Sequence, residues 1–152
     1  MGNRKANIQA ALVLLKECLD VKQVATLYES TPVGFVNQEN FYNTALEAET
    51  DLSPLELLKL INDIERKVGR IKRFVNGPRE IDVDIIFFDD LIIKDSTLEI
   101  PHPRMHERDF VLKPLVELDS RLIHPVFNVT VDQLLRSLPK NSASILKIIT
   151  ND

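Results

Sequence analysis

The stretch that most constrains the fold is the run from Ile81 to Phe88, which reads Ile-Asp-Val-Asp-Ile-Ile-Phe-Phe and follows a turn-forming Gly77-Pro78. Its β-branched and aromatic residues predict a β-strand. Side chains alternate along a strand, so we expect Asp82 and Asp84 to point the same way, roughly 7 Å apart. Apolar residues on both faces predict a strand that is covered on both sides.

Two aspartates on a covered strand need a positive partner, because an unpaired buried carboxylate is costly and a second like charge adds to the cost. The simplest partner is Mg²⁺, which binds carboxylate, phosphate and water oxygens. Two such ions about 3.5–4 Å apart would clamp a phosphoryl group. The alternative is that Asp82 and Asp84 lie on a solvated face of a sheet or pair with nearby arginines.

Length and composition indicate an ordinary globular protein. A chain of 152 residues, with 44% hydrophobic and 28% charged residues, is expected to form one domain. The net charge of -4 argues against a nucleic-acid partner. The single cysteine, Cys18, shares a helical stripe with Ala11 and Leu15 and is expected in the core. We see no signal peptide and no membrane-spanning run, so we expect a cytoplasmic monomer without a membrane partner.

The order of expected elements predicts an α+β fold, with an antiparallel sheet flanked by helices. Capping boxes, Ser53 to Glu56 and Thr130 to Gln133, mark two helix starts. The expected helices are 3–19 with Asn3 as N-cap, 53–69 ending at Gly69, part of 105–115 interrupted at Pro114, and 130–138. The expected strands are 21–29, 41–49, 81–88, 91–93 and 97–100, with a long loop at 30–40 and a strand or helix at 145–149.

Basic residues flank the acidic strand in sequence. They are Arg66, Lys67, Arg70, Lys72, Arg73 and Arg79 before it, and Arg104, Arg108 and Lys113 after it. Positive charge next to an acidic pair suits a polyphosphate, since phosphate oxygens bind arginine and a metal together. The helix dipole alone would explain the basic residues at a helix end. No P-loop or protein-kinase signature is present, so phosphate binding needs another scaffold.

Several motifs then point to one family. They are Gly77-Pro78-Arg79-Glu80-Ile81-Asp82-Val83-Asp84-Ile85-Ile86, Ile100-Pro101-His102-Pro103-Arg104-Met105, Arg108-Asp109-Phe110, Ser30-Thr31-Pro32-Val33-Gly34 and Gln38-Glu39-Asn40-Phe41-Tyr42-Asn43. Together they resemble the hydroxymethyl-dihydropterin pyrophosphokinases of folate biosynthesis. The resemblance runs in register from about Asn3 to about Leu138.

The resemblance implies a ferredoxin-like α/β sandwich with a mainly antiparallel sheet flanked by helices, formed by one pterin pyrophosphokinase domain over residues 1–152. Such an enzyme transfers diphosphate from ATP to the hydroxymethyl group of 6-hydroxymethyl-7,8-dihydropterin and releases AMP. Family members open with a strand that has no counterpart here. We therefore expect that strand to be missing or to lie upstream of Met1.

The resemblance also implies roles for individual residues. Asp82 and Asp84 would hold two Mg²⁺ ions and form the catalytic set together with Arg70 and Arg79. The residues implied for ATP are Glu65, Lys72, Arg73, Arg79, Ile85, His102 and Arg108. Those implied for the pterin are Ser30, Pro32, Val33, Gly34, Phe41, Asn43 and Phe110, with the two phenylalanines on either side of the ring.

Each assignment has a structural alternative. Phe41 and Phe110 could be core aromatics, Asn43 a turn former, His102 a structural imidazole, and Arg79 the ion-pair partner of the acidic strand. For the whole chain, the alternative is a catalytically impaired or non-catalytic ferredoxin-like binding module. Formation of AMP from ATP and the reduced pterin separates the two.

Overall fold

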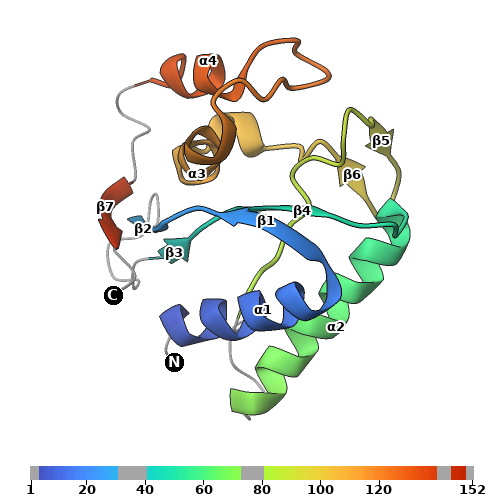
Figure 1. Cartoon of the computed structure of the whole chain (residues 1–152). Helices are drawn as coiled ribbons and strands as arrows, with labels where there is room; N and C mark the ends of the chain where they lie inside the picture. The colour runs from blue at the N-terminus through green and yellow to red at the C-terminus, as the bar shows by residue number, and fades with distance from the viewer. Residues whose placement is uncertain (1–3, 31–40, 73–80, 140–144, 150–152) are drawn as a thin grey trace. The chain divides into compact units, whose positions relative to one another are not determined.

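The computed structural model describes residues 4–30, 41–72, 81–139 and 145–149. Figure 1 shows the helices and short strands of the chain, in which β1 to β4 follow one another between α1 and α2. The chain divides into two compact units. Unit 1 comprises Met1–Val21 and Ala48–Ile85, and unit 2 comprises Lys22–Glu47 and Ile86–Asp152. The expected N-cap, Asn3, lies outside the described residues.

Two helices form the core of unit 1. Helix α1 (Arg4–Cys18) contacts α2 (Pro54–Lys72), as Figure 1 shows. The buried residues recur at helical spacing on each helix, and they are Asn7, Ala11 and Leu15 on α1 and Ile61, Ile64 and Val68 on α2. Cys18 is exposed, so its placement in the core was wrong. The helix ends at Cys18, and the buried stripe does not continue past Leu15.

Helix α2 begins where the sequence predicts. The Ser53 N–H donates to Glu56 Oε1 at 2.9 Å and the Glu56 N–H donates to Ser53 Oγ at 3.2 Å, which completes the capping box. The predicted end at Gly69 was wrong, because the helix continues to Lys72. Glycine weakens a helix by only about 1 kcal/mol relative to alanine, so it does not stop one by itself.

Each of the two long strands predicted before residue 50 is split. The first becomes β1 (Asp20–Val24) and β2 (Leu27–Ser30), and the second becomes β3 (Phe41–Asn43) and β4 (Leu46–Glu49). The breaks are bonded to each other. The Ala25 N–H donates to the Ala45 carbonyl at 2.8 Å, and Thr44 Oγ1 donates to the carbonyls of Ala25 and Thr26 at 2.9 and 3.0 Å. On one side of these breaks β1 pairs with β4, and on the other side β2 pairs with β3, so the two pairs belong to different sheets.

The sheet of unit 2 has the strand order β3-β2-β7, and both pairings are antiparallel. Strand β7 (Ile145–Ile149) settles the choice between strand and helix for that segment. Tyr28 lies opposite Asn43, and Ser30 lies opposite Phe41. Opposed residues share a face and so do residues two apart, so these four side chains belong to one face. We call it the Ser30 face.

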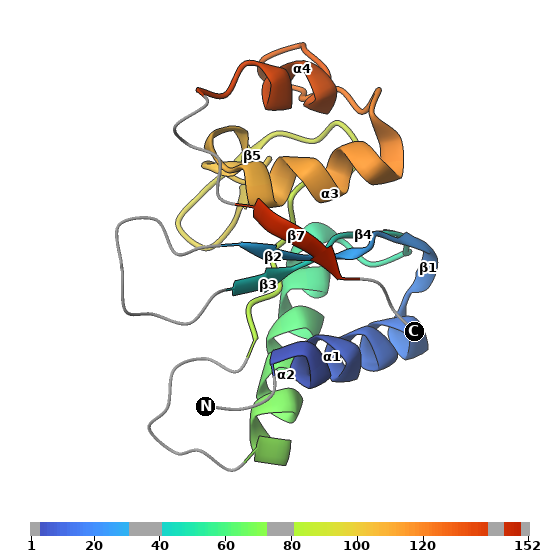
Figure 2. The same ribbon diagram turned by 90° about the vertical axis from the view of Figure 1, so that its left-hand side faces the viewer.

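Helix α3 (Asp109–Asp119) lies across the β3-β2-β7 sheet, and α4 (Val131–Arg136) lies on the other side of α3 (Figure 2). A 3₁₀ turn, η1 (Met105–Glu107), precedes α3. The core between these helices is formed by Met105, Leu112, Leu115 and Val131. Pro114 was predicted to interrupt this segment and does not. Its ring is fully buried, and that packing offsets the single backbone hydrogen bond that a proline removes.

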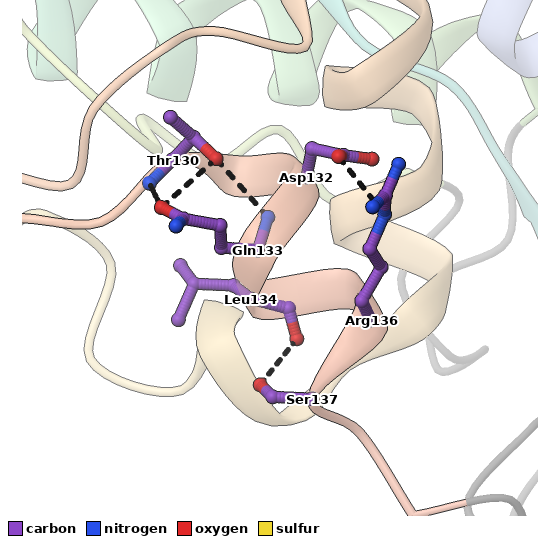
Figure 3. Close-up of polar contacts among 6 residues, drawn as sticks. All are labelled: Thr130, Asp132, Gln133, Leu134, Arg136 and Ser137. Atoms are coloured by element: carbon purple, nitrogen blue, oxygen red, sulfur yellow. Dashed lines mark hydrogen bonds and ion pairs between the residues drawn. The ribbon is translucent and has the colours of Figure 1, made fainter.

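Helix α4 confirms the second capping box, drawn in Figure 3. The Thr130 N–H donates to Gln133 Oε1 at 2.8 Å, and the Gln133 N–H donates to Thr130 Oγ1 at 3.1 Å. Arg136 pairs with Asp132 at 3.0 Å one turn earlier. The helix ends at Arg136, slightly before the predicted Leu138.

Residues 81–88 are not a strand, which corrects the prediction for the acidic run. Residues 81–85 keep the alternating exposure of an extended chain, but a strand exists only where a neighbouring strand supplies a ladder of hydrogen bonds. From later in the chain, the His102 N–H donates to the Ile86 carbonyl at 3.0 Å and the Leu91 N–H donates to the Phe88 carbonyl at 3.1 Å. The next strands are the antiparallel pair β5 (Ile93–Lys94) and β6 (Glu99–Ile100).

The mixed α+β class, with small antiparallel sheets and helices, agrees with the sequence prediction. None of the helices in the described part of the chain has the length and apolar character that a membrane crossing requires.

Candidate functional site

The acidic pair lies at the end of unit 1. Asp82 and Asp84 are both exposed, whereas Ile81, Val83 and Ile85 are half-buried. Both aspartates are thus on the solvent-exposed side of their half-buried neighbours, as an extended segment with one outward side would have them. The prediction that they are covered was wrong, and the argument that burial demands a counter-charge does not apply to exposed carboxylates. What remains is a pair of carboxylates that a ligand can reach.

Glu65 fixes the backbone between the two aspartates. It lies on α2, and its Oε2 accepts the Val83 N–H at 2.8 Å. This is a charge-assisted hydrogen bond, which is stronger than a bond between neutral groups. The residue assigned by resemblance to ATP therefore binds the acidic segment itself in this structure.

The donor set of the acidic pair fits magnesium. Carboxylate oxygens are hard ligands, and Mg²⁺ commonly takes only one or two from a protein while phosphate and water fill its other positions. Among the residues that the structure describes, no group of three or more His, Cys, Asp or Glu side chains could hold a metal ion. Asp82 and Asp84 can supply two ligands, which leaves the other positions of a Mg²⁺ ion to phosphate and water oxygens.

Few of the basic residues assigned to phosphate can be placed. Arg70 and Lys72 belong to the end of α2, but their side chains are not among those described, and Arg73 and Arg79 lie outside the described residues. Arg66, one of the flanking basic residues, forms an ion pair with Asp63, and both are exposed.

The Ser30 face carries three residues assigned to the pterin. Ser30 is buried, Asn43 is half-buried, and Phe41 is 44% exposed. Asn43 Nδ2 donates to Ser30 Oγ at 3.5 Å across the β2–β3 pair. Because Phe41 is so exposed, its reading as a core aromatic was wrong, and Asn43 lies in a strand and not in a turn. Pro32, Val33 and Gly34 lie outside the described residues.

Phe110 joins the same region from α3. That helix contacts both β2 and β3. In Figure 2 it runs antiparallel to β2, so its first turn lies over the end of the sheet where β2 stops and β3 begins. The guanidinium of Arg108 lies 5.6 Å from the centre of the half-buried Phe110 ring, in a cation–π contact. The sequence assigned these two residues to different substrates, and the structure makes them neighbours.

His102 occupies a turn in unit 2. Its backbone follows the cis Ile100-Pro101 bond, and its Nδ1 accepts the Arg104 N–H at 3.3 Å. The imidazole thus has a structural role in the turn. With Nδ1 as acceptor, a neutral ring carries its proton on Nε2, which can donate to a ligand.

Sequence reasoning missed one polar network, centred on Glu117 of α3. Its Oε2 accepts the Thr26 N–H at 2.8 Å, and its Oε1 accepts from Thr26 Oγ1 and from the Tyr28 hydroxyl, each at 2.6 Å. Burial raises the pKa of Glu117, but these hydrogen bonds outweigh it and the pKa falls below its ordinary value. Burial and the bond to Glu117 raise the pKa of Tyr28. One feature of the sequence could have indicated this network: Glu117 follows Phe110 by two helical turns, so the two residues lie on the same face of the helix.

Comparison with known proteins decides the family. The model of the 7,8-dihydro-6-hydroxymethylpterin-pyrophosphokinase (HPPK) family matches residues 1–120. The chain belongs to the HPPK family. The 2-amino-4-hydroxy-6-hydroxymethyldihydropteridine pyrophosphokinase of Aquifex aeolicus is 44% identical over 127 residues, which cover 84% of this chain and 79% of that protein.

Two further relatives set the scale of the match. The pyrophosphokinase of the same name from Bacillus subtilis is 38% identical over 135 residues, which cover 88% of this chain and 81% of the relative. A folic acid synthesis protein of Dictyostelium discoideum is 43% identical over 139 residues, or 91% of this chain. The matched region is only 21% of that longer protein, so HPPK sequences occur both as short chains and as parts of larger ones.

Proposed function

We propose that this chain transfers diphosphate from ATP to the hydroxymethyl group of 6-hydroxymethyl-7,8-dihydropterin and releases AMP, a step of tetrahydrofolate biosynthesis. The observation that carries the proposal is membership of the HPPK family over residues 1–120, which include every residue assigned to ATP, metal or pterin. The proposal includes the family's ferredoxin-like sandwich, a single catalytic domain, and action as a cytoplasmic monomer.

In this proposal Asp82 and Asp84 hold two Mg²⁺ ions with the phosphate oxygens of ATP. Their hard oxygen atoms, shared side and exposure support the assignment. The ions, when bound, neutralise charge on the diphosphate group that is transferred. The Glu65 bond to the Val83 N–H keeps the two carboxylates oriented, so they need little rearrangement to bind.

The pterin occupies the Ser30 face in this proposal. Phe41 and Phe110 stack on the ring, and Asn43 hydrogen-bonds to its polar edge while Ser30 Oγ orients the amide. Asn43 is suited to this because an amide offers both donors and an acceptor, as a pterin edge does. Ser30, Pro32, Val33 and Gly34 would supply further contacts to the same edge.

The positive residues bind the phosphates. Arg70, Lys72, Arg73 and Arg79 are assigned to the triphosphate, and His102, Arg108, Glu65 and Ile85 to ATP more broadly. For Arg108, the cation–π contact with Phe110 supports a guanidinium that is already oriented. No general base is required, since phosphoryl transfer of this kind depends mainly on positioning and charge neutralisation.

The experiment mixes the protein with ATP, Mg²⁺ and the reduced pterin and measures AMP. We expect AMP formation that Asp82→Ala and Asp84→Ala each reduce by at least about a hundredfold, as loss of a group that stabilises transition-state charge commonly does. Thermal unfolding should change little, because both side chains are exposed. Asp90→Ala, an exposed aspartate in the following turn, is the matched control. Activity that survives both substitutions would refute the metal assignment, and no AMP from the unaltered chain would favour a non-catalytic binding module.

A further inference from the structure

Glu117 of α3 is hydrogen-bonded to Tyr28 of β2 and to Thr26, which directly precedes that strand. One carboxylate accepts three hydrogen bonds of 2.6–2.8 Å, two from Thr26 and one from Tyr28. A second link lies beside it, where Gln23 Nε2 donates to the Leu118 carbonyl at 3.1 Å. The hydroxyl of Tyr28 is carried by a buried side chain, whereas Glu117 itself is exposed. The helix is thus held to the strand from its solvent side.

The partners of Glu117 belong to the same surfaces as the pterin residues. Glu117 follows Phe110 by seven residues, so both lie on one face of α3, roughly 10 Å apart along the axis. Tyr28 lies on the Ser30 face, opposite Asn43 in the β2–β3 register. A rotation or slide of α3 would therefore move the Phe110 ring relative to Ser30, Phe41 and Asn43.

The bonds fix both the distance and the rotation of α3. Three donors that converge from two residues on one carboxylate restrict its position more than a single bond could. The depressed pKa of Glu117 agrees with a carboxylate that stays charged at neutral pH. The apolar cluster of unit 2 packs Leu112 and Leu115 of α3 against Met105 and Val131.

We propose that Glu117 is a positioning residue of the pterin site: through Thr26 and Tyr28 it holds the Phe110 end of α3 at the separation from the Ser30 face that a flat ring requires. This inference rests on the proposed function, since it takes the Ser30 face and Phe110 to be the pterin site. Glu117 itself lies two helical turns from Phe110 and does not touch the substrate.

The test measures binding of 6-hydroxymethyl-7,8-dihydropterin by calorimetry in the presence of Mg²⁺ and a non-hydrolysable ATP analogue. Glu117→Ala should weaken pterin binding about tenfold, because Phe110 is no longer held in place. A tenfold change corresponds to a loss of roughly 1.4 kcal/mol of binding free energy. Glu117→Gln should weaken it only about threefold, because its carbonyl oxygen accepts the Thr26 N–H while its amide donates to the two hydroxyls. Tyr28→Phe should lie between the unaltered chain and Glu117→Ala. Affinity for the ATP analogue should fall less than pterin affinity in all three, because Arg108 adjoins Phe110 but the other residues assigned to ATP lie outside α3.

Glu17→Gln, on the exposed side of α1, is the matched control and should change neither affinity. A Glu117→Ala protein that unfolds more easily yet binds the pterin as tightly as the unaltered chain would overturn the inference and leave Glu117 as a structural link only. Equal losses for pterin and ATP analogue would overturn it too. Failure of the proposed function looks different: the unaltered chain would bind the pterin but form no AMP. A chain that does not bind the pterin at all overturns both.

Discussion

Substitution of Glu65 tests whether helix α2 orients the carboxylates of Asp82 and Asp84 for metal binding. Glu65→Ala removes the acceptor of the Val83 N–H, and with it the contact that holds the backbone between Asp82 and Asp84. A hydrogen bond to a charged group contributes about 1.5–3 kcal/mol. Glu65 is half-buried, so the lower end of that range applies. About 1.5 kcal/mol corresponds to a factor of roughly ten in a binding constant.

The assay follows AMP formation against Mg²⁺ concentration with both substrates saturating. Glu65→Ala should raise the Mg²⁺ concentration for half-maximal rate about tenfold. Glu65→Gln should raise it only about twofold, because an amide carbonyl still accepts the Val83 N–H and only the charge is lost. Asp63→Ala, an exposed substitution on the same helix, controls for changes in α2 and should leave the Mg²⁺ requirement unaltered.

The effects of Glu65→Ala and Glu65→Gln on the Mg²⁺ requirement distinguish the possible roles of Glu65. If Gln is as damaging as Ala, the charge matters and the backbone hydrogen bond does not. If either variant raises KM for ATP and leaves the Mg²⁺ requirement unchanged, Glu65 acts on the nucleotide. Each of these results would refute a role in orienting the acidic pair.

Two further predictions concern stability. Thr130→Ala removes the capping box of α4 and should lower the free energy of unfolding by about 1 kcal/mol in urea denaturation. Thr130→Ser keeps the hydroxyl and should lower the free energy of unfolding far less. Equal losses for the two variants would contradict the capping role. Burial, and then His106, lower the pKa of His124, whose Nδ1 accepts the N–H groups of Val126 and Phe127 at 3.2 Å. The unfolded chain therefore binds a proton more readily, so stability is present above pH 6.5 and is lost as pH falls through the folded pKa. His124→Phe should remove the part of the pH dependence of stability that appears in urea denaturation as pH falls below 6.5, and an unchanged pH dependence would locate it in other groups.

The features that sequence predicted well depend on neighbours in the chain. Both capping boxes appear as expected, because Ser53 with Glu56 and Thr130 with Gln133 satisfy backbone groups within one turn. The alternating exposure around Asp82 and Asp84 is likewise local, since it follows from an extended backbone.

The features that sequence missed depend on distant partners. The breaks in the two long strands exist because Thr44 bonds to carbonyls near Ala25, and no local pattern announces that bond. The exposure of Asp82 and Asp84 was misjudged for the same reason: apolar residues on both sides of a segment show that it can be covered, but tertiary structure decides whether it is. Pro114 shows the converse, in which packing overrides a local helix breaker.

The sequence by itself determined the family, the chemistry of the acidic pair and where most helices begin, since all three depend on residue identity and short spacing. Only the tertiary structure decided that Ser30 and Asn43 share a face and that Glu117 of α3 binds Thr26 and Tyr28. These contacts join residues separated by a loop or by most of the chain, and their geometry is set by strand register and helix packing, which residue spacing does not encode.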